Sequence, residues 1–225
     1  MPAAPNPELL RSLGRLVRGL SALFWGLPLA LLVCVQSAKL DWLQSFNIFP
    51  ALAATGLLLF GLLQIGGFHR HERPWRAALD RAKLLALINC GLSPFLFWWN
   101  RVPDNSFFSF TLVVLALSGV LFLFSLNGVL LRLGDMLPDQ SLRHEIRQFT
   151  ALNRHLLATL LLLAAFFVAV AQVPQLPAPL ATMLFAAHQI GQWLLLFLSL
   201  LPLALTMALI WKTKEIVLEG VFGAN

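Results

Sequence analysis

The strongest candidates for chemistry in this chain are polar side chains that lie inside long apolar stretches. His188, Gln189 and Gln192 form the densest group, and His188 and Gln192 lie one helical turn apart, on the same helix face. Asn89 and Ser93 interrupt an earlier apolar stretch. Polar side chains in a bilayer usually bond across helices, whereas a buried ionisable group is a candidate ligand contact. These five residues are the predicted intramembrane polar cluster.

Histidines elsewhere in the chain do not fit a metal or haem site. Residues 69–72 read His-Arg-His-Glu, but zinc needs a third or fourth convergent ligand, and the flanking arginines repel a cation. His155 and His188 fall at different predicted depths, so they do not pair as haem ligands within one chain. Nucleophile motifs, glycine-rich phosphate loops and acidic pairs are missing. The sequence predicts no catalytic residue, no metal ligand and no cofactor.

Arginines beside the apolar stretches favour contacts with the phosphates of anionic lipids. The predicted lipid contacts lie in three segments: Arg11, Arg15, Arg18, Arg70, Arg73, Arg76, Arg143 and Arg147. Sixteen Lys and Arg against ten Asp and Glu give a formal charge of +6. The expected partners are a bilayer with anionic headgroups and other membrane subunits or further copies of the chain, rather than nucleic acid.

Composition restricts the class of protein that can position these residues. Of 225 residues, 59% are hydrophobic and 12% are charged, whereas soluble domains are about 25% charged. The mean hydropathy is +0.79. A soluble fold of this size cannot bury so much apolar surface. The composition excludes an ordinary cytosolic enzyme, a disordered tail, a fibre and a nucleic-acid-binding domain, and it indicates an integral membrane protein.

Six apolar stretches approach the roughly 20 residues that a spanning helix needs. They cover residues 17–37, 47–67, 83–100, 107–131, 155–173 and 180–211, and the third is weakened by Asn89, Ser93 and Pro94. Basic amphipathic segments precede three of them. In the segment before the fifth, Leu142, Ile146, Phe149 and Leu156 repeat at helical spacing. The predicted fold is an all-α membrane protein: one domain, residues 1–225, with six transmembrane helices and amphipathic interfacial helices on the cytoplasmic side.

Charge distribution predicts the orientation. With six spans, every Lys and Arg except Lys39 and Arg101 falls on one side, which the positive-inside rule identifies as cytoplasmic. Both termini are therefore expected in the cytoplasm, with the protein in a bacterial-type inner membrane. The first apolar stretch is longer than a signal-peptide core, so it is predicted to be retained as a transmembrane helix.

Charged residues are absent from the interior of the predicted spans, which argues against ion transport. The leading hypothesis is a non-catalytic membrane subunit or scaffold that packs against lipids and other membrane proteins. A second hypothesis is a transporter or channel for a neutral or lipid-like substrate, with a cavity lined by Asn89, Ser93, His188 and Gln192. A third is a membrane enzyme or redox subunit that uses histidine.

Overall fold

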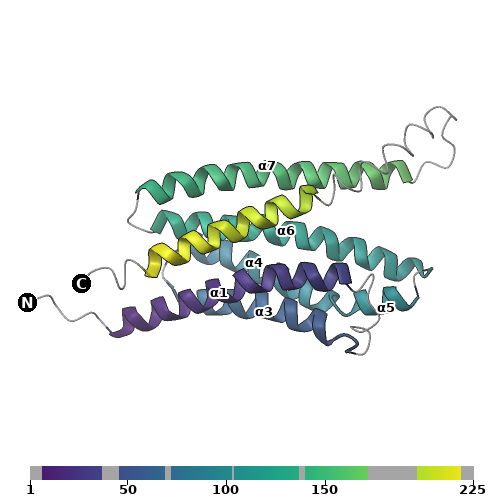
Figure 1. Ribbon diagram of the computed structural model, residues 1–225, viewed down its shortest axis with the longest axis horizontal. Coiled ribbons are helices and arrows are strands. Elements are labelled where there is room, and N and C mark those ends of the chain that lie inside the picture. Colours follow the sequence, from purple (N-terminus) through teal and green to yellow (C-terminus); the bar gives the residue numbers. More distant parts are fainter. Residues whose placement is uncertain are drawn as a thin grey trace, which may run out of the picture.

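The computed structural model describes residues 7–36, 46–68, 72–102, 104–136, 140–171 and 197–218. All regular secondary structure within these ranges is helical, which confirms the all-α prediction for them. The helices are α1 (Pro7–Gln36), α3 (Phe49–Ile65), α4 (Arg73–Leu92), α5 (Phe95–Arg101), α6 (Ser106–Met136), α7 (Gln140–Ala171) and a C-terminal helix (Phe197–Leu218). They run lengthwise in an elongated bundle (Figure 1).

Helix length and surface chemistry both fit a membrane. Among the described residues, five helical segments are long and apolar enough to cross a bilayer, and the sixth apolar helix, α3, has 17 residues. Large apolar side chains such as Trp25, Phe110 and Leu162 face outward and are well exposed. Exposed apolar surface on this scale is unfavourable in water but is expected against lipid tails.

The predicted interfacial helices are not separate elements. The basic amphipathic segments form the first turns of α1, α4 and α7, and each helix continues without interruption into its apolar part. A break between the two parts would leave backbone carbonyls and amides unpaired at the edge of the bilayer, and a continuous helix pairs them internally. The last span also differs from its prediction: its described helix continues beyond 211 to Leu218, and residues 180–196 lie outside the described residues.

The third predicted span is broken where its polar residues indicated weakness. α4 ends at Leu92, a turn covers Ser93 and Pro94, and α5 begins at Phe95. Proline has no amide hydrogen, so Pro94 cannot bond the carbonyl of Cys90 one turn earlier. The Ser93 hydroxyl donates to that carbonyl at 2.9 Å and takes the place of the missing amide.

α1 and α3 approach closely because glycines face each other. A Cβ built on Gly19 would lie 2.7 Å from the carbonyl oxygen of Gly61, and one built on Gly61 would lie 2.9 Å from that of Gly19. Two turns along α1, a Cβ on Gly26 would meet the side chain of Leu58 at 2.8 Å. Small residues that allow backbones this close are a common basis of helix packing in membranes.

The alternating helix directions gather basic residues at one end of the bundle. The starts of α1, α4 and α7 lie at the left in Figure 1, together with the ends of α6 and the C-terminal helix. The described Lys and Arg lie at or toward this end, Lys83 and Arg154 near the middle of their helices, except Arg101, which closes α5 at the opposite end. The bundle is therefore strongly polarised in charge along its length.

Candidate functional site

Two predicted members of the intramembrane cluster, Asn89 and Ser93, are buried in helix contacts. Besides its bond to the carbonyl of Cys90, Ser93 Oγ accepts a hydrogen bond from Thr55 Oγ1 of α3 at 3.3 Å. Asn89 Oδ1 is buried without a hydrogen-bond partner among the described residues. Ser93 therefore connects α4 to α3, as expected of a residue that holds helices together.

The other three members of that cluster, His188, Gln189 and Gln192, lie outside the described residues. Their grouping with Asn89 and Ser93 stays a prediction. His69 and His71 also lie outside, and no group of three His, Cys, Asp or Glu that could hold a metal occurs within the described ranges.

A different polar cluster joins three helices inside the bundle. Asn127 of α6, Asn153 of α7 and Thr206 of the C-terminal helix are fully buried. Asn153 Nδ2 donates to Asn127 Oδ1 at 3.0 Å and to Thr206 Oγ1 at 2.9 Å, and Asn127 Nδ2 donates to Thr206 Oγ1 at 3.0 Å. Asn153 Nδ2 also lies 3.2 Å from the carbonyl oxygen of Pro202. These bonds fasten the C-terminal helix to α6 and α7.

Sequence reasoning did not select Asn153 because it lies in a basic segment, directly before Arg154. The predicted apolar stripe of α7 is rotated relative to the buried one: Phe149 is 40% exposed, whereas Ile146, Asn153 and Leu157 are buried. In a membrane protein an apolar side chain can face lipid, so apolar spacing alone does not identify the packed face. The sequence did contain one indication of this burial. The spacing of Ile146, Asn153 and Leu157 places Asn153 on the same helix face as two apolar residues.

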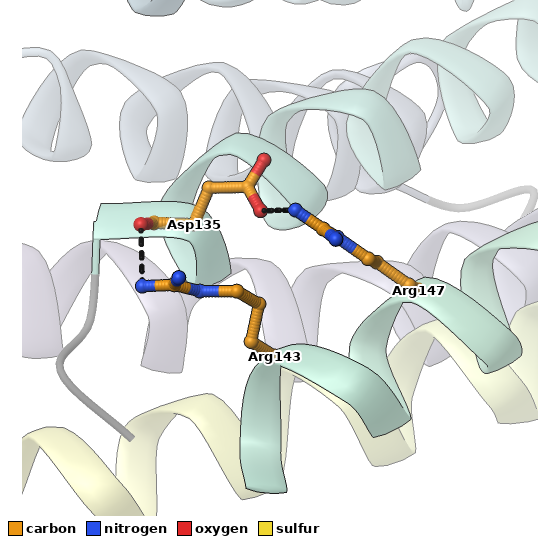
Figure 2. Close-up of polar contacts among 3 residues, drawn as sticks. All are labelled: Asp135, Arg143 and Arg147. Atoms are coloured by element: carbon orange, nitrogen blue, oxygen red, sulfur yellow. Dashed lines mark hydrogen bonds and ion pairs between the residues drawn. The ribbon is translucent and has the colours of Figure 1, made fainter. Parts of the chain in front are cut away.

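Two predicted lipid contacts, Arg143 and Arg147, bind the end of the preceding helix. Arg147 Nη2 donates to Asp135 Oδ1 at 2.9 Å, and Arg143 Nη2 donates to the backbone carbonyl of Asp135 at 3.1 Å (Figure 2). Cations at a helix C-terminus also interact favourably with its dipole. Both arginines therefore fasten α7 to α6, while the 61% exposed side chain of Arg147 keeps access to its surroundings.

Arg15 and Arg76 line the same pocket at the basic end of the bundle. The cavity measures about 490 Å³ and lies between α1, the end of α3 and the first half of α4. Its lining residues come from all three elements: Arg15, Leu63, Gln64, Gly66, Gly67, Arg76, Leu79, Asp80 and Lys83. Positions 76, 80 and 83 fall on one face of α4, so a single helix contributes three charged groups.

Glycines and a buried tryptophan shape this pocket. A Cβ on Gly66 would lie 2.8 Å from Lys83 Nζ, and one on Gly67 would lie 3.4 Å from Nη1 of Arg15. The indole of Trp75, buried at the start of α4, donates to the carbonyl of Phe68 at 3.0 Å. This bond ties the turn after α3 to α4, and the two glycines in that turn let Lys83 and Arg15 lie close to its backbone.

The pocket carries more positive than negative charge. Arg15, Arg76 and Lys83 face it, whereas Asp80 is its single acidic lining residue and lies 3.8 Å from Lys83 Nζ. A second cavity of about 520 Å³, lined by Arg11, Gly14, Arg15 and Arg18, shares Arg15 with the first. The two neighbouring cavities are therefore both lined by basic side chains suited to an anionic group.

Four of the eight predicted lipid arginines line these cavities: Arg11, Arg15, Arg18 and Arg76. Arg73 is exposed on the first turn of α4, and Arg70 lies outside the described residues. Sequence reasoning missed Lys83, Gln64 and the glycines. The predicted third span begins at Lys83, and no local motif links that residue to residue 15.

Comparison of the chain with protein-family models, with curated proteins and with solved structures yields no match.

Proposed function

We propose that this chain is a non-catalytic integral membrane subunit or scaffold that acts by packing against lipids and other membrane proteins. The observation that carries the proposal is the use of its buried polar groups. Asn127, Asn153 and Thr206 bond to one another, and Ser93 bonds to Thr55, so these side chains hold the bundle together. Polar side chains that bond across helices in this way act in packing, which supports a structural role.

The lipid-facing surface gives further support. Exposed aromatic and aliphatic side chains extend along the described helices, including Trp25, Phe60 and Phe110. Such a surface suits contact with lipid chains and with the helices of another subunit. The transport hypothesis has no comparable support, because Asn89 and Ser93, which it requires in a cavity lining, are buried among helices.

The direct experiment combines assembly state with transport. The chain is extracted with its surrounding lipids in polymer nanodiscs, and its complexes are weighed by native mass spectrometry. We expect a defined complex with a second membrane subunit or a further copy. In parallel, purified protein in liposomes is tested for glycerol and urea permeation by light scattering. A monomer that accelerates permeation of either solute would refute the scaffold role.

We also propose that the basic end faces the cytoplasm of a bacterial-type inner membrane. The supporting observation is that the described Lys and Arg, except Arg101, lie at or toward one end of the bundle. Fusing alkaline phosphatase or green fluorescent protein after residue 225 tests this orientation. We expect fluorescence without phosphatase activity, and the reverse pattern would overturn the assignment.

A further inference from the structure

We propose that the pocket between α1, α3 and α4 binds the phosphate group of one anionic phospholipid. This inference does not depend on the scaffold role, because a chain with any other activity could hold the same lipid. It differs from general attraction to a charged surface in predicting one saturable site built by Arg15, Arg76 and Lys83.

The pocket offers the donors that phosphate needs. Guanidinium groups from two helices, α1 and α4, supply planar pairs of N–H donors, and Lys83 adds a compact ammonium charge. Among the described residues, neither the side chain of Arg15 nor that of Arg76 has a hydrogen-bond or ion-pair partner within the protein. Lys83 is only loosely paired with Asp80, whose side chain is 67% exposed. The cationic groups are thus free to bind an external anion.

The space beside these cations is maintained by backbone. Gly66 and Gly67 present no side chain toward Lys83 and Arg15, and a methyl group on Gly66 would contact Lys83 Nζ at 2.8 Å. The bond from Trp75 to the carbonyl of Phe68 holds this turn against α4. The glycine backbone therefore lets Lys83 and Arg15 lie close to this turn, where both line the cavity.

The position of the pocket favours a lipid over a soluble phosphate. It lies at the end of α3, whose last two turns carry the exposed apolar side chains of Phe60 and Leu63. Leu63 also lines the cavity. Positions 60 and 63 are one turn apart, so they form a short apolar track leading away from the cations. A headgroup phosphate in the pocket would place its acyl chains along this track.

Lipid binding is measured by native mass spectrometry of the full chain in detergent. The chain is titrated separately with dioleoyl phosphatidylglycerol, with dioleoyl phosphatidylcholine and with inorganic phosphate. We expect one phosphatidylglycerol to bind saturably and phosphatidylcholine to bind more weakly. Stoichiometric binding of inorganic phosphate without preference for phosphatidylglycerol would overturn the lipid assignment.

Charge-matched variants separate a site from a charged surface. Arg76→Gln removes a lining cation, whereas Arg81→Gln removes an exposed cation of the same helix that does not line the pocket. Each basic residue near anionic lipid contributes a factor of about five in binding. We expect Arg76→Gln and Arg15→Gln to weaken phosphatidylglycerol binding about fivefold or more, with Arg81→Gln close to the parent chain. Equal losses in Arg76→Gln and Arg81→Gln would refute a discrete site.

A third variant changes the shape of the pocket without changing its charge. Gly66→Ala places a methyl group against the flexible end of Lys83, so the fold can accommodate it while the space for phosphate shrinks. We expect weaker phosphatidylglycerol binding and an unchanged helical circular-dichroism spectrum. Unchanged affinity in this variant and in Arg15→Gln would show that the lipid binds elsewhere.

Discussion

The contact between α1 and α3 should be sensitive to a single methyl group. In Gly61→Ala, the new Cβ would lie 2.9 Å from the carbonyl oxygen of Gly19 and 2.9 Å from Leu23 Cγ, whereas ordinary contact begins at 3.4 Å. A Cβ added at Gly56, on the same helix, meets no atom within 4 Å. Gly56→Ala is therefore a matched control with the same chemical change and no clash.

The expected magnitude follows from this geometry. To accept the methyl group at Gly61, α1 and α3 must separate locally by about 0.5 Å, and overpacking of this kind costs about 1–3 kcal/mol. Alanine is also favoured over glycine within a helix by about 0.8–1.0 kcal/mol in water. Both substitutions share that preference, so it cancels in their comparison. The free energy of unfolding of Gly61→Ala should be about 1–3 kcal/mol lower than that of Gly56→Ala. A difference of about 1.4 kcal/mol corresponds to a tenfold change in the unfolding equilibrium constant.

Unfolding by dodecyl sulfate in mixed micelles, followed by circular dichroism, gives the free energy of each variant. Gly19→Ala, whose Cβ would lie 2.7 Å from the carbonyl oxygen of Gly61, should resemble Gly61→Ala. The double variant should cost less than the sum of the two, because the first substitution has already separated the helices. Coincident unfolding curves for Gly61→Ala and Gly56→Ala would refute the close approach of the two backbones.

Three further predictions concern polar contacts and use the same unfolding measurement. Asn153→Ala removes the amide that bonds to Asn127 and should destabilise the bundle by about 1–3 kcal/mol. Ser93→Ala leaves the carbonyl at the α4–α5 break without its hydroxyl donor and should cost about 1 kcal/mol, with faster hydrogen exchange around the break. Lys212→Gln removes the partly exposed ion pair with Glu145 and should cost less than about 1 kcal/mol, a difference that fades in about 1 M salt.

Each of these three has a result that contradicts it. Gln148→Ala changes an exposed amide of α7 and should be nearly neutral, so equal effects of Gln148→Ala and Asn153→Ala would deny the buried bonds a special role. Unchanged exchange around the break in Ser93→Ala would mean that the hydroxyl does not replace the missing amide. A loss in Lys212→Gln that persists at high salt would indicate a packing effect.

The helices of this fold were largely predictable, because their signal is local. Each of the six apolar stretches contains or overlaps an observed helix, and the turn at Ser93 and Pro94 falls where the third stretch was weakest. The boundaries were less accurate. A basic amphipathic segment does not reveal whether it ends or continues as a helix, and in α1, α4 and α7 it continues.

Contacts between distant segments were not predictable in the same way. The apolar spacing of α7 predicted an amphipathic helix but did not indicate which of its residues pack against other helices, and Asn153 is buried whereas Phe149 is exposed. The pocket depends on Lys83 lying beside Gly66 and Arg15 beside Gly67, and their proximity follows from how the helices are rotated and paired. Charge predicted the chemistry of this region, whereas only the assembled bundle defines its shape.

The bonds of the C-terminal helix have a consequence for the order of folding. Thr206 meets Asn153 and Asn127, which precede it by 53 and 79 residues. A nascent chain synthesised only through α7 can form the bond between the two asparagines but lacks the hydroxyl that both of them also bond, in a medium where a missing hydrogen bond is costly. The last helix supplies Thr206, which bonds both asparagines and so connects α6 and α7 to the C-terminal helix. The stability that these bonds give to the bundle is therefore complete only when the last helix is in place.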